Sequence, residues 1–250
     1  MPTLFLNSVL FTLKDTPVSE NKYVQIFNVW ISKLIQNGGL TKDDFLLISI
    51  DERTMEHIKM SPGCLGALMS KLQCPYAFKI FPAPDTILDG MKIRYTVHEF
   101  THDAYMYLDI DVLVMKSLKT LPLKPGNLYV MAEGSLADPN YGADMSIKDG
   151  IGHTSAIIIC TDPYIQKILF TRVCEIYRNA GYYTIDQPFF NSVLYLLPHD
   201  SSLTKYVSYN GQSYSKGDTV LLNCGGDVAN GSKHKDKIDD VICMINVGLF

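Results

Sequence analysis

Two aspartates lie in the middle of an otherwise apolar run, YMYLDIDVLVM, which spans residues 105 to 115. An acidic residue at a strand end is often a turn former or a cap, but the strand pattern resumes after Asp111. If the backbone stays extended, Asp109 and Asp111 face the same side. Adjacent carboxylates at the edge of a core repel each other and are costly to desolvate, and a divalent cation removes that conflict. Because hard oxygen ligands suit Mn²⁺ or Mg²⁺, which bridge to substrate phosphates, the spacing predicts a metal site for a phosphorylated ligand.

Two other stretches carry side chains that can do chemistry, and each also has a plain structural explanation. Lys92 and Arg94 lie on a run that reads as a helix entering the 105–115 strand, where they could simply form a solvated helix face. Asp186-Gln187-Pro188 has the composition of a helix start, in which Asp186 would be a good N-cap. Residue types alone leave both alternatives open.

Strand-like runs alternate with helix-like runs along the chain. Apolar residues from Tyr23 to Ile35 recur at helical spacing, with Ser19 as the expected N-cap and Gly38-Gly39 as the end. This alternation predicts an α/β fold in one domain over residues 1–250, with a mostly parallel central sheet and helices on both faces. The other expected elements are strands at about 3–13, 45–50, 105–115, 127–132, 155–160 and 219–223, and helices at about 61–73, 91–100, 162–181 and from 186 onward.

Composition narrows the class of protein. The chain has 47% apolar and 19% charged residues, which is typical of a folded globular protein. Its net charge of -4 does not favour a nucleic-acid or membrane surface. The six cysteines show no C-x-x-C spacing, so we expect free thiols in a reducing compartment. The apolar start lacks a basic flank and a cleavage site and is too short to span a bilayer, so a cytoplasmic protein is expected.

Several motifs in order resemble glycosyltransferase family 8, the glycogenin and bacterial galactosyltransferase group of the GT-A fold. YLDIDVLVMKSL looks like the D-x-D segment of that family, and MKIRYTVHEFTHDAYMYLDID resembles its basic residue, helix and strand before the D-x-D. GIGHTSAIIIC resembles its second central strand, TIDQPFFNSVLY its Asp-Gln…Asn helix start, and LNCGGDVANGSKHK its C-terminal loop. The likeness covers most of residues 3 to 236 and is clear at these motifs.

The resemblance implies a glycosyltransferase that moves a sugar from a UDP-sugar to a hydroxyl of a sugar, glycan or protein, with retention. Asp111 would ligate Mn²⁺ or Mg²⁺, and Asp109 would serve both the metal and the ribose hydroxyls. Either Lys92 or Arg94, which spacing does not separate, would contact the nucleotide or donor sugar. Asp186 and Gln187 would lie beside the donor sugar and the acceptor, and Asn191 would serve structure or sugar binding.

The C-terminal loop departs from the family pattern. The family commonly supplies a histidine as the third metal ligand just before the glycine, whereas this chain has Asn223 and Cys224 there. The amide of Asn223 is a legitimate oxygen ligand for a hard cation. The resemblance places Gly231, Lys233 and His234 over the diphosphate, although the loop could instead be solvated.

The end of the first strand is expected to flank the base and ribose, because ligands lie at the carboxyl ends of parallel strands. This assigns Thr12 and Lys14 to the nucleotide. Tyr23 could stack on uracil, but its helical spacing favours the core. A GT-A-like sugar nucleotidyltransferase is an alternative, but it usually has a glycine-rich loop after strand one, and FTLKDTPVSENKY has no glycine. A non-catalytic sugar-binding module is the other alternative, and the intact acidic residues argue against it.

Overall fold

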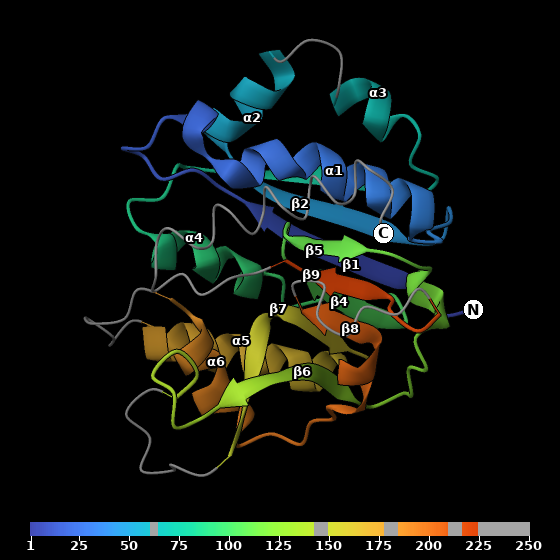
Figure 1. Cartoon of the computed structure of the whole chain (residues 1–250), viewed down its shortest axis with the longest axis vertical. Helices are drawn as coiled ribbons and strands as arrows, with labels where there is room; N and C mark the ends of the chain where they lie inside the picture. The colour runs from blue at the N-terminus through green and yellow to red at the C-terminus, as the bar shows by residue number, and fades with distance from the viewer. Residues whose placement is uncertain (61–64, 143–149, 178–184, 210–216, 225–250) are drawn as a thin grey trace.

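The structure is a computed structural model that describes residues 1–60, 65–142, 150–177, 185–209 and 217–224. Within these ranges a six-stranded sheet, in the order β3-β2-β1-β4-β7-β6, forms the centre of the fold (Figure 1). The first four of these strands are mutually parallel, whereas β7 is antiparallel to both β4 and β6. The strands are Leu4–Leu10 (β1), Phe45–Asp51 (β2), Tyr76–Phe81 (β3), Ala104–Leu108 (β4), Leu128–Ser135 (β6) and Ile151–Cys160 (β7).

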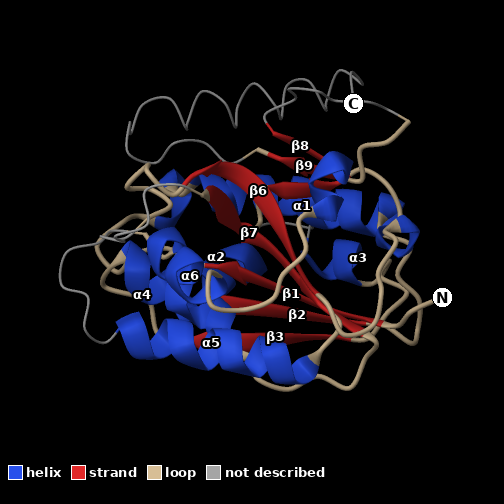
Figure 2. Ribbon diagram, turned by 90° about the horizontal axis from the view of Figure 1, so that it is seen from below, coloured by secondary structure: helices blue, strands red, loops and turns tan. Residues whose placement is uncertain are grey.

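Helices cover both faces of this sheet. The apolar sides of α1, α2 and α3 join one core, and those of α4, α5 and α6 join the other. Figure 2 shows α1 and α5 on opposite sides of the strands. The predicted α/β fold, with a mostly parallel sheet and helices on both faces, is confirmed. The helices are Lys22–Asn37 (α1), Glu52–Met60 (α2), Leu65–Met69 (α3), Ile87–Lys92 (α4), Pro163–Tyr177 (α5) and Gln187–Leu194 (α6), with 3₁₀ turns at Val18–Glu20, Ile93–Thr96, Leu118–Thr120 and Ser202–Tyr206.

The strand that leads into the D-x-D is buried on both faces. In β4, Met106 and Leu108 face the core under α1, whereas Tyr105 and Tyr107 face the core under α5. All four side chains are fully buried, and each such burial stabilises the fold by about 1.5–3 kcal/mol. The residues that follow β4 therefore start from a rigid position.

The predicted continuous strand over 105–115 is wrong. β4 ends at Leu108, and the amide of Val112 donates to the carbonyl of Asp109 (N···O 3.0 Å), which closes a turn over residues 109–112. Asp is favoured in such turns. The chain then enters a second sheet, β5-β9-β8, made of Val112–Val114 (β5), Val207–Tyr209 (β8) and Leu221–Asn223 (β9). Strand alternation therefore does not relate the two aspartates.

The first helix starts at a different cap from the one predicted. Asn21, not Ser19, caps α1, because its side-chain oxygen accepts a hydrogen bond from the amide of Tyr23 (2.9 Å). Ser19 lies inside a 3₁₀ turn that precedes the helix. The predicted end is confirmed, since α1 stops at Asn37 and Gly39 has a φ of 67°, a conformation that favours glycine.

The helix predicted over 91–100 is misplaced. α4 begins after Thr86, whose hydroxyl oxygen accepts a hydrogen bond from the amide of Asp89 (3.1 Å), and it ends at Lys92. A 3₁₀ turn follows and carries Arg94 inward, where the residue is 3% exposed. The overlooked signal is the Thr-x-x-Asp start, which resembles a capping box.

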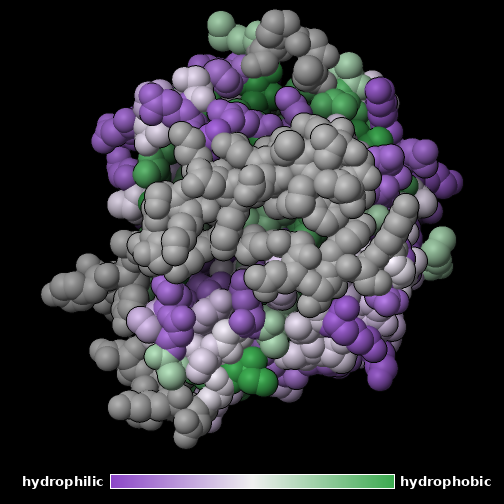
Figure 3. Space-filling model, in the orientation of Figure 1, coloured by the Kyte–Doolittle hydropathy of each residue, from purple (hydrophilic) through white to green (hydrophobic). Residues whose placement is uncertain are grey.

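On the described part of the face in Figure 3, hydrophilic and hydrophobic side chains are interspersed. Single exposed apolar side chains such as Met60 and Tyr164 are normal on a folded surface. None of the described helices is both long and apolar enough to cross a bilayer. The expected helix start at Ser61-Pro62 and the expected helix end at Gly181 lie outside the described residues.

Candidate functional site

A cavity of about 690 Å³ opens at the carboxyl ends of β1 and β4. This is the edge at which parallel sheets commonly bind ligands, and the volume lies within the usual range for a small-molecule site. The loop after β1, the start of α1, the 3₁₀ turn after α4 and the turn after β4 form its wall. Residues that line it include Phe11, Thr12, Tyr23, Arg94, Tyr107 and Asp109.

The loop after β1 is fixed by hydrogen bonds to neighbouring elements. The amide of Thr12 donates to Asp51 (2.8 Å), and Asn21 Nδ2 donates to the Thr12 hydroxyl (2.8 Å). The guanidinium of Arg53 donates to the carbonyls of Leu13 and Thr16, each at 3.0 Å. Asp51, Asn21 and Arg53 are positioning residues that the sequence reasoning missed.

Of the two residues expected beside the nucleotide at this loop, only Thr12 reaches the cavity wall. The ammonium of Lys14 lies 3.6 Å from Asp85 at the surface, and its side chain is 65% exposed. Lys14 is not among the described residues that line the cavity. Tyr23, which its spacing assigned to the core, lies against the core and also lines the cavity.

The D-x-D turn presents the carboxylate of Asp109 to the cavity, whereas Asp111 is tied through its backbone to the residue that follows β9. The carboxylate of Asp109 accepts a hydrogen bond from the hydroxyl of Tyr107, and its amide donates to Ala156 in β7 (2.9 Å). The carbonyl of Asp111 accepts from the amide of Cys224 (2.9 Å). Within the described part of the chain, Asp111 Oδ1 is buried and has no hydrogen-bond partner.

Asp111 is buried, Asp109 is partly buried, and their carboxylates repel each other, which favours the binding of a cation between them. Burial raises the pKa of Asp109, the charge of Arg94 opposes that change, and the charge of Asp111 adds to it. Burial also raises the pKa of Asp111, and the nearby charge of Glu133 raises it further. A divalent cation would offset the burial cost and give the orphaned oxygen of Asp111 a partner.

Asn223, expected as a third ligand, lies in the strand next to the turn. β9 pairs with β5 so that Asn223 lies opposite Val112, and Asn223 is buried. Among the described residues, no group of three His, Cys, Asp or Glu side chains could hold a metal ion. An amide oxygen from Asn223 would therefore matter for a metal at this turn. The predicted loop residues Gly231, Lys233 and His234 lie outside the described residues.

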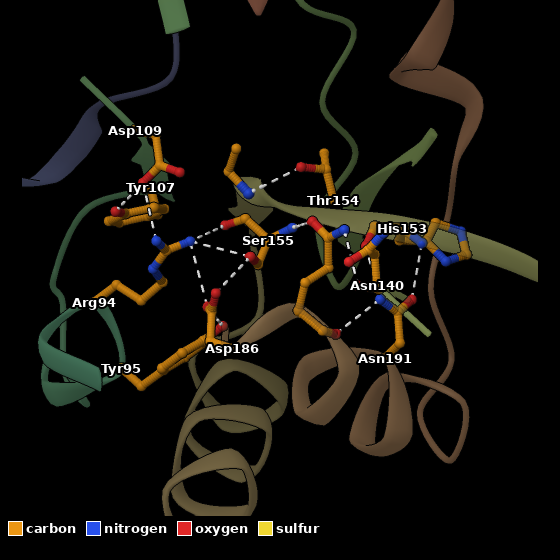
Figure 4. Close-up of polar contacts among 12 residues, drawn as sticks. Arg94, Tyr95, Tyr107, Asp109, Asn140, His153, Thr154, Ser155, Asp186 and Asn191 are labelled. Atoms are coloured by element: carbon orange, nitrogen blue, oxygen red, sulfur yellow. Dashed lines mark hydrogen bonds and ion pairs between the residues drawn. The ribbon is translucent and has the colours of Figure 1, made fainter. Parts of the chain in front are cut away.

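The structure separates the two basic residues that spacing could not distinguish. Lys92 pairs with Asp89 at 2.9 Å within α4 and is not among the described residues that line the cavity. Arg94 lines the cavity, and its guanidinium lies 3.3 Å from Asp109 and 3.4 Å from Asp186 (Figure 4). The guanidinium carbon also lies 4.8 Å from the centroid of the Tyr107 ring, a cation–π distance.

The capping explanation for Asp186 is wrong. Its backbone is helical, and its side chain makes no capping hydrogen bond. Instead the buried carboxylate accepts hydrogen bonds from the hydroxyls of Tyr95 (2.6 Å) and Ser155 (3.2 Å) and pairs with Arg94 (Figure 4). No pattern in the sequence marks Tyr95 or Ser155 as part of this site. Three donors converge on one carboxylate, so its position and charge are firmly held.

Gln187 and Asn191 connect α6 to the central sheet. Gln187 Oε1 accepts from the amide of Ser155 (3.2 Å), and its Nε2 donates to the carbonyl of Asn140 (3.3 Å). The Asn191 amide accepts from the backbone amide of His153 and donates to its carbonyl, each at 2.8 Å. Asn191 therefore anchors α6 on β7. Of the two expected roles, structure and sugar binding, these contacts are of the structural kind.

The fold has counterparts among solved structures. One of them is the apo structure of WbbM, a bifunctional glycosyltransferase. The match has a TM-score of 0.57 and 12% sequence identity, and covers 90% of this chain and 46% of that one. The chain thus spans less than half the length of that neighbour, and the likeness shows a shared fold. No protein-family model and no curated protein matches this sequence.

Proposed function

We propose that this chain is a metal-dependent glycosyltransferase of the GT-A type, which moves a sugar from a UDP-sugar to a hydroxyl acceptor with retention. The observation that carries the proposal is the turn at residues 109–112, which lies at the edge of the cavity and holds a buried carboxylate oxygen of Asp111 without a hydrogen-bond partner. The shared fold with a bifunctional glycosyltransferase supports it.

The proposed metal, Mn²⁺ or Mg²⁺, would be held by Asp109, Asp111 and Asn223. When bound, it would offset the negative charge that develops on the nucleoside diphosphate as the glycosidic bond breaks. The cavity beside Phe11, Thr12 and Tyr23 would take the base and ribose. Its aromatic side chains offer the apolar contacts that a uracil ring favours.

The donor sugar would lie between the D-x-D turn and the start of α6. Arg94 bridges these two places, so its donors would hold both the donor sugar site and Asp186 in one arrangement. Asp186 would accept a hydrogen bond from a sugar hydroxyl, and Gln187 would orient the sugar and the acceptor. Preorganised groups of this kind favour a transition state because they need not reorganise when charge develops.

Metal and donor binding test this proposal directly. Calorimetry should show that the parent binds UDP far more tightly with Mn²⁺ than without it, and slow release of UDP from a panel of UDP-sugars should follow. Asp111→Ala should abolish both the Mn²⁺-dependent binding and the release. Asp85→Ala is the matched control, because that carboxylate is 76% exposed on the surface. Mn²⁺-dependent UDP binding at parental strength in Asp111→Ala would overturn the metal assignment.

A further inference from the structure

The ring of Tyr141 packs over two glycines of the central sheet, and Tyr141 is not among the described residues that line the cavity. Gly134 of β6 and Gly152 of β7 are paired in the sheet, and the ring of Tyr141 lies over both. A methyl group added at Gly134 would come within 2.4 Å of that ring, and one added at Gly152 within 2.6 Å. Any side chain at either glycine would displace the ring, so the packing of Tyr141 on the sheet requires both glycines.

The turn that carries Tyr141 is well fixed. The amide of Tyr141 donates to the carbonyl of Asp138 (2.9 Å), and the amide of Asn140 donates to the Asp138 side chain (2.8 Å). The carbonyl of Asn140 in turn accepts a hydrogen bond from Gln187 (3.3 Å). Tyr141 is therefore placed relative to the start of α6, and Asn140 lies in the same polar network as Asp186 (Figure 4).

Glu133, which directly precedes Gly134 in β6, lies next to Tyr141. Burial raises the pKa of Glu133, and its side-chain hydrogen bonds with Thr154 and Tyr141 oppose part of that change. The charge of Glu133 also raises the pKa of Asp111, so the two carboxylates interact electrostatically. Tyr209 of β8 borders the same group, with its hydroxyl 3.5 Å from the carbonyl of Ala132.

We propose that Glu133 and Tyr141 form the acceptor subsite and that the acceptor is a carbohydrate. This rests on the proposed function, since it assigns the second substrate of the same site. The ring of a half-buried tyrosine offers an apolar surface for the C–H face of a sugar. A carboxyl group offers two oxygens as hydrogen-bond acceptors, so Glu133 suits neighbouring sugar hydroxyls. Glu133 interacts with the charge of Asp111, and Tyr141 forms a side-chain hydrogen bond with Gln187. The subsite therefore adjoins both the proposed metal ligand and the start of α6, and neither residue is among the described residues that line the nucleotide cavity.

The test compares two reactions of one protein, release of UDP with water as acceptor and with a panel of mono- and disaccharides present. In the parent, at least one saccharide should accelerate UDP release above the rate in water. In Glu133→Gln and Tyr141→Ala, the ratio of saccharide-stimulated release to release in water should fall about tenfold or more, the expected effect of losing a hydrogen bond to a charged group. Tyr164→Ala, at an exposed position on α5, is the matched control.

Gly134→Ala provides a second variant that leaves every polar group in place. The added methyl group should displace the Tyr141 ring and lower the ratio of saccharide-stimulated UDP release to release in water. This variant tests the subsite even where Tyr141→Ala is unstable. Saccharide stimulation at the parental ratio in all three variants would overturn the subsite, as would a parent that hydrolyses the donor but is stimulated by no saccharide. A parent that neither binds UDP with Mn²⁺ nor releases it would instead overturn the proposed function.

Discussion

The guanidinium of Arg94 joins the D-x-D turn to the first residue before α6, because it lies 3.3 Å from Asp109 and 3.4 Å from Asp186. The two carboxylates are 77 positions apart in the sequence (186 − 109). Burial alone would lower the pKa of Arg94, but the charges of Asp109 and Asp186 raise it, so the cation is retained. The buried guanidinium of Arg94 thus holds the D-x-D turn and the start of α6 in a fixed relative position.

Replacing Arg94 with Lys tests this bridge. A lysine keeps the charge but cannot reach both carboxylates with a planar fork. We expect Arg94→Lys to lower the free energy of unfolding by about 1.5–3 kcal/mol and to reduce UDP-sugar hydrolysis strongly. Thermal unfolding and a hydrolysis assay measure the two effects. Lys92→Met is the control, since Lys92 pairs with Asp89 within α4 and is not among the described residues that line the cavity, and a larger loss in that variant would contradict the assignment of Arg94.

Asp186 should now be expected to contribute to stability as well as to turnover. As a plain cap it would tolerate Asn well, but the structure shows a buried carboxylate paired with Arg94. We therefore expect Asp186→Asn to lower stability by about 1–3 kcal/mol, with UDP affinity retained and transfer lost. Urea unfolding, UDP calorimetry and a transfer assay separate these effects. Tyr95→Phe removes one donor to Asp186 and should give a smaller loss of the same kind.

Much of the fold was predictable from the sequence because single segments specify it locally. The apolar face of α1 and the continuous apolar run of β2 each carry a period or a length that needs no knowledge of the rest of the chain. The end of α1 at Gly38-Gly39 is equally local. The error at Ser19 arose because a second capping residue, Asn21, lies two positions further along. The error at 91–100 arose because the helix starts earlier, at the Thr86 cap.

The contacts that join the residues of the candidate site could not be predicted from the sequence, because they link segments that only the tertiary fold brings together. The role of Arg94 depends on a 3₁₀ turn that faces Asp186, 92 positions further along the chain (186 − 94). Tyr95 and Ser155 are ordinary residues in the sequence and become important only because they reach one carboxylate. The turn at Asp109 was hidden because apolar residues continue on both sides of it.

A buried ion pair far from the cavity predicts how the fold responds to acid. Lys119 lies 2.8 Å from Asp44, and both side chains are almost fully buried. Burial alone would raise the pKa of Asp44, but hydrogen bonds from Lys119, Thr41 and the amide of Leu4 lower it. A carboxyl with a lowered folded-state pKa contributes stability above its ordinary pKa, and this contribution is lost as the pH falls through the folded value.

Lys119→Met should therefore cost about 3–5 kcal/mol near pH 7, because it leaves Asp44 charged and buried without its cation. The loss should shrink as the pH is lowered toward about 4, since Asp44 can then become neutral. Urea unfolding at several pH values measures this trend. Lys167→Met is the control, because its side chain is 59% exposed and its partner Glu99 is 4.0 Å away. A constant loss at every pH would contradict the argument.

Asn223 should respond to a change of charge if it ligates the metal. Asn223→Asp keeps the shape of a buried side chain and adds a negative oxygen ligand, so Mn²⁺ affinity should increase. Asn223→Ala should weaken it by about tenfold or more. Calorimetry with MnCl₂ and UDP measures both. Unchanged affinity in the two variants would remove Asn223 from the metal site, while leaving Asp109 and Asp111 in place.

The raised pKa values of Asp109 and Asp111 predict that Mn²⁺ binding depends on pH. Burial raises both values, while Arg94 opposes the change. Without metal, the folded chain therefore holds these protons more tightly than the unfolded chain, and the resulting stability is lost as the pH rises through the raised values. A divalent cation needs both carboxylates deprotonated, so the increase in Tm caused by MnCl₂ should grow between about pH 5.5 and 7.5. Thermal unfolding with and without MnCl₂ across this range measures the effect, and Asp111→Asn should lose most of it. An increase in Tm that is the same at every pH would mean that Mn²⁺ binds at groups other than these two aspartates.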